Sequence, residues 1–389
     1  MDVLLNKFWR LNIICCAGIA LTTLYEKGDI TSLLFYLSFL ITAFCMWLCL
    51  RKPVTRYSGN TLLILLYLVL MGFISVMQGG VSFAYLKKFI IYITTLSSFY
   101  IASKIHANSR TVAYLLGSNI VVSVFYMIRS QAEGAYIGDV LLLFFSNPNF
   151  TGMWLFMSIM LLVVTLFLVK KKFWKCIIAA LAGYLVYLCF ETEARNIWFA
   201  IGYAAFLCVL CLAARVPRFK KWVLFAIDLY PLLFAVAYMF AIANNMITED
   251  VSDLLVSEGK PITSRYAIWK TAFDAIKERP LFGAYSTIGG GSGSFQLHNT
   301  HIDMWAAYGT VGLSFFLWYI YRIMKEVNDF CNSKGAMFAL AGFMCMTLMG
   351  CAEAGLYSTG MGMYIYVSSF LLLANYLNRK QQNESCISI

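Results

Sequence analysis

A succession of long apolar segments separated by short polar ones constrains this chain more than any other feature. A helix needs about 20 apolar residues to cross the hydrocarbon core of a bilayer. Of the 389 residues, 61% are hydrophobic and only 13% are charged, whereas about 25% of the residues of a soluble domain are charged. The pattern excludes a soluble globular enzyme and indicates an all-α polytopic membrane protein.

We predict about twelve transmembrane helices in a single membrane domain, residues 1–389. The predicted spans are 11–25, 30–50, 61–77, 84–103, 111–128, 151–169, 176–190, 197–213, 222–243, 301–321, 335–352 and 363–378. One long polar loop, residues 244–300, separates the ninth predicted span from the tenth.

The distribution of Lys and Arg predicts the orientation. If the N-terminus is cytoplasmic, 20 of the 30 Lys and Arg residues fall in cytoplasmic segments, and five of the other ten fall in the long loop. Cytoplasmic loops of membrane proteins are enriched in these residues, so the net charge of +11 does not require a nucleic-acid partner. We therefore predict that both termini are cytoplasmic and that the loop 244–300 is extracytoplasmic.

The long loop carries a predicted amphipathic helix. Ser264 is a suitable N-cap, and Pro280 ends a helical stretch that runs to about Glu278. Arg265 and Trp269 share one face of this stretch through their i, i+4 spacing. We expect the helix to lie on the outer membrane surface; the alternative is a simple interfacial helix whose Arg side chain reaches toward water.

Two of the chain's three histidines, His298 and His301, stand at the start of the tenth predicted span. A histidine at the mouth of a membrane helix can act as a general base near neutral pH. The alternative is a polar helix start in which Asn299 or Thr300 caps the helix. A zinc site would need a third ligand, and the sequence offers none, so we predict no metal.

Several cations fall on the predicted outer side. Arg195 stands in a tight polar turn between two apolar spans, and Lys87 and Lys88 stand in a segment that reads as membrane-embedded. Because a cation in or beside a bilayer is costly, each suggests an anionic partner, such as a lipid phosphate or pyrophosphate. The alternatives are an ion pair with Glu191 or Glu193 for Arg195, and snorkelling for the lysines.

Two asparagines, Asn147 and Asn149, flank Pro148 just before the sixth predicted span. They fit a turn and helix cap, or a pair of amides that binds sugar.

Together these residues resemble the O-antigen ligase/O-antigen polymerase superfamily. The resemblance lies in Arg265-x-x-x-Trp269, Pro280-x-x-Gly283, and His298-Asn299 followed after nine residues by Gly309-x-x-Gly312, with Arg195 and Asn147-Pro148-Asn149 at recurring positions. It implies a GT-C-like membrane glycosyltransferase, inverting and without cofactor or metal. It would use undecaprenyl-pyrophosphate-linked glycan on the outer face of the bacterial cytoplasmic (inner) membrane.

The resemblance also suggests roles for the residues. His298 would be the catalytic base, and Arg195, Arg265 and Lys88 would bind pyrophosphate. The residues expected to position the substrate are Asn299, His301, Trp269, Asn147 and Asn149. The expected partners are a lipid-linked oligosaccharide, membrane lipid and a chain-length regulator protein.

Within this class we predict a polysaccharide polymerase of the O-antigen or capsule type, which joins one lipid-linked repeat unit to another. The compact loop and the Glu-Ala pair before Arg195 favour it over an O-antigen ligase that transfers glycan to lipid A-core. The alternative from another class is a flippase for lipid-linked oligosaccharide. A flippase would need cations along a central path, whereas here they gather on one side.

Overall fold

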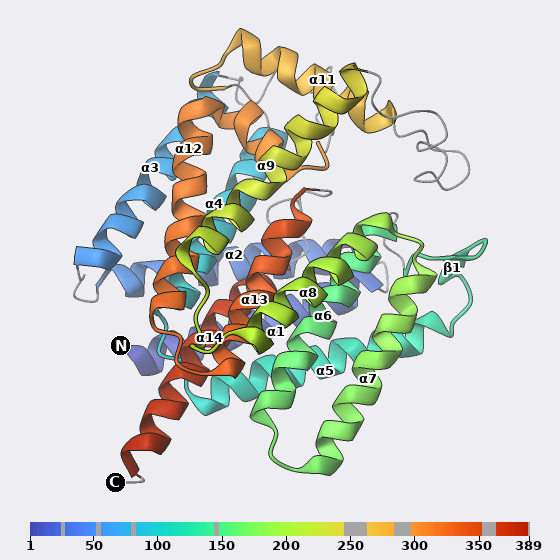
Figure 1. Ribbon diagram of the computed structural model, residues 1–389, viewed down its shortest axis with the longest axis vertical. Coiled ribbons are helices and arrows are strands. Elements are labelled where there is room, and N and C mark those ends of the chain that lie inside the picture. The colour runs from blue at the N-terminus through green and yellow to red at the C-terminus, as the bar shows by residue number, and fades with distance from the viewer. Residues whose placement is uncertain are drawn as a thin grey trace.

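The computed structural model describes residues 1–24, 28–51, 56–78, 83–143, 148–244, 263–283, 297–351 and 363–387 of the chain. Its helices are α1 (Asp2–Leu24), α2 (Gly28–Leu50), α3 (Arg56–Gln78), α4 (Phe83–Lys104), α5 (Ser109–Ser130), α6 (Pro148–Leu168), α7 (Lys172–Glu191), α8 (Arg195–Ala213), α9 (Lys221–Ala243), α11 (Thr263–Glu278), α12 (Thr300–Asp329), α13 (Lys334–Met349) and α14 (Met363–Ile387). Figure 1 shows their arrangement.

A helix lies at each of the twelve predicted spans, and α11 lies at the predicted amphipathic helix. Within the described ranges, eight helices are long and apolar enough to cross a membrane: α1, α2, α3, α5, α6, α7, α8 and α9. The prediction of an all-α polytopic membrane protein is therefore confirmed in its class, while the number of twelve crossings stays a prediction. A short hairpin of β1 (Tyr136–Ile137) and β2 (Val140–Leu141), which the sequence analysis did not anticipate, connects α5 to α6.

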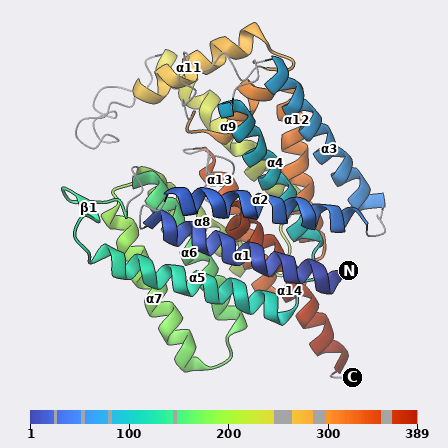
Figure 2. The same ribbon diagram turned by 180° about the vertical axis from the view of Figure 1, so that it is seen from behind.

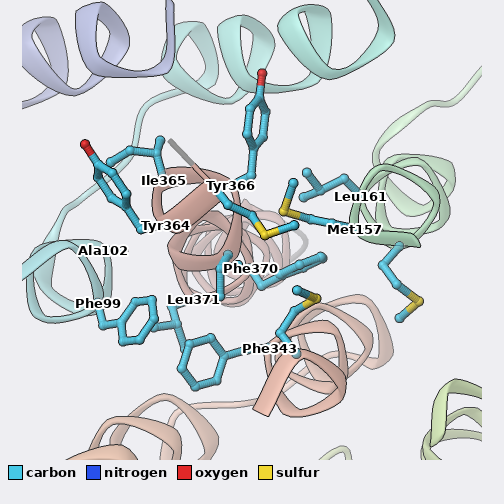
Figure 3. Packing of buried hydrophobic residues seen from close by; sticks show 14 of the residues in the cluster. Phe99, Ala102, Met157, Leu161, Phe343, Tyr364, Ile365, Tyr366, Phe370 and Leu371 are labelled. Atoms are coloured by element: carbon cyan, nitrogen blue, oxygen red, sulfur yellow. The ribbon is translucent and has the colours of Figure 1, made fainter. Parts of the chain in front are cut away.

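The centre of the molecule is formed by α13 and α14. Residues 335–349 of α13 and 363–374 of α14 are buried throughout, and Figure 3 shows Phe343 and Phe370 packed between their neighbours. Gly342 makes this packing possible, because a Cβ atom there would lie 2.5 Å from the Phe370 ring. Small residues allow membrane helices to approach closely, and here one of them admits an aromatic ring.

One end of the molecule is held together by side chains that bond to backbone carbonyls of other segments. Asn6 donates to the His106 carbonyl (2.9 Å), Arg379 donates to the Ile105 carbonyl (2.9 Å), and Lys334 donates to the Cys211 carbonyl (2.6 Å). These bonds connect α1, α13 and α14 to segments in or next to those that the charge pattern assigns to the cytoplasm. Figures 1 and 2 show both termini on the same side of the molecule, which agrees with the predicted even number of crossings.

The tenth predicted span, 301–321, is not one continuous helix, and this prediction is corrected. Gly309 has non-helical dihedral angles (φ 68°, ψ −176°) inside α12. In a straight helix His301 and Phe316 would be about 22 Å apart, yet their ring centroids are 5.5 Å apart. The chain therefore turns back at Gly309, and residues 300–308 lie beside the part of α12 that follows.

A close backbone contact sustains this reversal. A Cβ atom on Gly309 would lie 2.3 Å from the Leu281 carbonyl, and one on Gly283 would lie 2.5 Å from the Gly309 nitrogen. The N–H of Thr310 donates to the Pro280 carbonyl at 2.8 Å. This donor has no helical partner across the break, because its usual acceptor is four residues earlier. The segment after α11 thus replaces hydrogen bonds that α12 loses.

Gly309 should therefore tolerate no side chain. We expect Gly309→Ala to lower the thermal midpoint strongly, because both the positive φ and the contact with residue 281 oppose a methyl group. Overpacking of this kind costs about 1–3 kcal/mol or more. Thermal unfolding of purified protein in detergent is the measurement.

Gly117→Ala is the matched control, because Gly117 lies in α5 with no atom near its would-be Cβ. Alanine in an open helical position stabilises by up to about 1 kcal/mol. Equal midpoints for the two variants would contradict the reversal at Gly309.

Candidate active site

The His298 block lies inside the helical bundle rather than at its surface. Asn299 donates from Nδ2 to the carbonyl of Pro231 at 2.9 Å, and Pro231 stands near the middle of α9. The N–H of Thr300 donates to the carbonyl of Gly350 at 2.9 Å, at the end of α13. The block thus begins beside the middle of α9 and the end of α13, and its expected position at the outer mouth of a span stays a prediction.

Asn299 organises this block. Its Oδ1 accepts hydrogen bonds from the N–H groups of His301 and Ile302, both at 3.0 Å, so it is the N-cap of α12, one of the alternatives that the sequence left open. Its Nδ2 also donates to the Cys351 carbonyl at 3.2 Å. One buried amide therefore connects α9, α12 and the end of α13.

His298 has an unusual backbone conformation. Its φ is +50°, in the left-handed region that few non-glycine residues adopt. His298 is half-buried, whereas Leu297, Asn299, Thr300 and His301 around it are buried. Such conformations persist only where the surroundings impose them, and the bonds made by Asn299 and Thr300 supply that constraint.

The second histidine is in a different environment. His301 is fully buried, lies beside the backbone of Asp228 and touches the ring of Phe316. Neither of its ring nitrogens has a hydrogen-bond partner among the described residues. In this arrangement His301 does not reach an open surface, and its expected role in positioning the substrate stays a prediction.

The helix α11 forms a cover over the block, as Figures 1 and 2 show. Its buried residues Trp269, Ala272 and Ile276 pack against Ala235 of α9 and against Ile302 and Ala306 of α12. Trp269 also donates from Nε1 to the Leu297 carbonyl, directly before His298. The predicted amphipathic helix is confirmed, but this apolar face packs on protein rather than on lipid, and Trp269 supports the loop.

The middle of α8 approaches the same region. Arg195 is the first residue of α8, and eight residues further on Tyr203 approaches the Cys351 sulfur at 3.3 Å and donates to the Tyr230 hydroxyl at 2.9 Å. Asn299 and Tyr203 thus meet at Cys351. Tyr203, Tyr230 and Cys351 were not predicted from the sequence, because a single polar atom in an apolar span gives no pattern.

Asn149 lies beside the start of α8. Its carbonyl accepts a hydrogen bond from Asn196 Nδ2 at 3.4 Å. Gly152 allows the two helices to approach, because a Cβ there would lie 2.5 Å from Ile197. The helix starts that carry Asn149 and Arg195 are therefore adjacent.

Some predicted site residues are not placed. Asn147 and the side chains of Lys88, Arg195 and Arg265 lie outside the described part of the structure. Across the described ranges, no group of three or more His, Cys, Asp or Glu side chains could hold a metal ion.

The fold and this site together define a class: a polytopic helical membrane protein with a histidine loop held inside its bundle. Residues 180–317 match the family described as O-antigen ligase. The match confirms the predicted resemblance to the O-antigen ligase/polymerase superfamily over this segment, about a third of the chain. No curated protein sequence matches the chain.

The matched range includes Arg195, Arg265, Trp269 and the whole block from His298 to Gly312. Lys88, Asn147 and Asn149 precede it. The eight apolar helices and the family match support a multi-pass protein of the bacterial inner membrane. The matching family acts on lipid-linked glycans and membrane lipids.

The position of Asn299 generates a prediction. Asn299→Ala should lower the thermal midpoint, because an N-cap is worth about 0.5–2 kcal/mol and two buried carbonyls lose a donor. Asn299→Asp retains the capping oxygen but not the Nδ2 donor, so its thermal midpoint should also stay below that of the wild type. Thermal unfolding and glycan transfer should be measured on the same preparations.

Asn244→Ala is the control, since the exposed Asn244 side chain bonds only within its own helix in the described structure, to Phe240. A wild-type thermal midpoint and wild-type glycan transfer in Asn299→Asp would show that the amide donor does not hold the loop.

Proposed function

We propose that the protein is a polysaccharide polymerase of the O-antigen or capsule type. It transfers undecaprenyl-pyrophosphate-linked glycan to a sugar hydroxyl of another lipid-linked repeat unit, on the extracytoplasmic side, with inversion and without a metal. The observation that carries the proposal is the constrained, half-buried His298 within the range that matches the family.

In the proposed reaction, a ring nitrogen of His298 takes the proton of the acceptor hydroxyl. The hydroxyl oxygen bonds to the anomeric carbon from the face opposite the leaving group, and the bond from that carbon to the pyrophosphate oxygen breaks. Lipid pyrophosphate leaves, and the proton on His298 passes to water. General base catalysis of this kind contributes about 10²–10⁴-fold.

The growing charge on the pyrophosphate needs cations. We assign this role to Arg195 and Arg265, with Lys88. Two observations support the arginines: Arg195 opens α8 and Arg265 lies in the first turn of α11, and helix N-termini favour anions. In addition, the N-cap residue of α8, Ala194, makes no side-chain cap hydrogen bond.

The O-antigen ligase reaction is the second candidate, because the matching family carries that description. The chemistry at His298 would be the same, and only the acceptor would be lipid A-core. The two are separated by the phenotype of a deletion strain. Loss of a polymerase leaves single-repeat decoration, whereas loss of a ligase leaves long lipid-linked glycan.

The first prediction from the proposed function concerns the catalytic base. His298→Ala should reduce polymer formation by about 10²-fold or more at normal protein level, and the acidic limb of the pH–rate profile should disappear. The measurement is polymer formed by purified protein from defined lipid-linked repeat units.

His301→Ala is the comparison for this prediction, because this imidazole is buried away from the surface. It should retain more activity than His298→Ala, and its thermal midpoint should fall. Near wild-type polymerisation by His298→Ala would refute the assignment.

The second prediction concerns the pyrophosphate. Arg195→Ala and Arg265→Ala should each remove most activity at unchanged protein level. Lysine at either position should restore activity only in part, because Arg holds phosphate oxygens as a planar fork and Lys as a point charge. Lys277→Ala is the control, since Lys277 is exposed and pairs with Asp274 on α11. An alanine variant with full activity would remove that arginine from the site.

A further inference from the structure

A cluster of tyrosines and polar side chains lies at the end of α7 that leads to Arg195. Tyr184, Tyr187 and Glu191 are spaced by three and four residues, so they share one face of the last turns of α7. Tyr136 of β1 and Gln131, the C-cap of α5, stand beside this face. Figures 1 and 2 show the hairpin next to this end of α7. We call these five residues the tyrosine platform.

Contacts connect the platform across three elements. Gln131 donates from Nε2 to the Tyr184 hydroxyl at 2.7 Å, which joins the end of α5 to α7. The rings of Tyr184 and Tyr187 have centroids 5.9 Å apart, and Tyr187 interacts with Glu191 one turn on. Partial burial and then the Glu191 carboxylate raise the pKa of Tyr136, so this carboxylate lies near the hairpin as well.

The bonds that hold the hairpin do not involve the side chains of the platform residues. The N–H of Leu142 donates to the Ala135 carbonyl at 2.9 Å, and Arg129 donates to the Glu133 carbonyl at 3.0 Å. Thr151 of α6 holds the other end through the carbonyl of Leu142. A surface that is fixed before binding avoids the entropy cost of ordering.

The platform is open to solvent or substrate rather than part of the core. Tyr187 is 50% exposed, Gln131 is exposed, and Tyr136 and Tyr184 are half-buried. Tyrosines alone at this level would fit the aromatic belt of a membrane interface. The amide of Gln131 and the carboxylate of Glu191 among the rings add hydrogen-bonding groups that a lipid contact does not need.

This composition matches a pyranose sugar. A sugar ring has an apolar C–H face, which packs on an aromatic ring, and an edge of hydroxyls, which bonds to amide and carboxylate groups. Sites of this kind combine aromatic surface with a few placed polar groups. A flat aromatic ring also supplies contact area at low conformational cost.

We infer that the tyrosine platform is a glycan-binding subsite that holds sugars of the lipid-linked chain away from the reacting end. The inference rests on the proposed function, because it takes Arg195 as the pyrophosphate position. Glu191 and Arg195 are four residues apart, so at most about 14 Å of chain separates them. A glycan whose pyrophosphate is held at Arg195 can thus extend over the platform.

The test uses direct binding, which does not need activity. Purified full-length protein is titrated with the delipidated repeat oligosaccharide of the host polysaccharide, followed by saturation-transfer NMR. Tyr187→Ala and Gln131→Ala should each weaken binding about threefold to tenfold, and Tyr187→Trp should restore it. Tyr36→Ala is the matched control, because Tyr36 is a comparably exposed (43%) tyrosine on α2.

A second readout separates this inference from the proposed function. In the polymerisation assay, platform variants should give shorter chains and a higher KM for long acceptors, with an unchanged rate on single repeat units. If wild-type protein binds the oligosaccharide but does not polymerise repeat units, the proposed function is overturned while the glycan-binding subsite is still supported. Unchanged binding in both platform variants, or the same loss in Tyr36→Ala, would overturn the subsite.

Discussion

The close backbone contact between Gly283 and Gly309 is the constraint on which the rest of the site depends. It allows α12 to turn back, which brings His301 against Phe316 and keeps residues 300–308 inside the bundle. Without this reversal, residues 300–308 could not lie beside the later part of α12. Two glycines separated by 26 residues thus determine where the candidate base can stand.

A proline in α9 creates a second break in helical hydrogen bonding beside the site. Pro231 has no N–H and interrupts the helix ladder, and its own carbonyl accepts a bond from Asn299. Asn299 in turn caps α12 and reaches Cys351. Broken helices at membrane depth persist only where their freed backbone groups find partners within the protein, and here the partners belong to the loop that carries His298.

Much of this could be predicted from the sequence. The twelve apolar segments, the amphipathic helix and the His298-Asn299 block all correspond to features of the structure, because hydrophobic periodicity and capping residues act locally. The reversal at Gly309 could not be predicted, since hydropathy carries no information on the sign of φ. The burial of Trp269 was also missed, because a periodic apolar face is the same whether lipid or protein covers it.

The contrast between the two histidines follows from these constraints. A general base must reach the acceptor hydroxyl and then release its proton to water. His301 is fully enclosed between α9 and the second part of α12, so a proton on its ring would have no path to solvent through the described side chains around it. His298 lies between the buried residues Leu297 and Asn299, and its own side chain is half-buried. The bonds on both sides fix its backbone while its side chain keeps access, and this combination supports His298 as the residue that exchanges the proton.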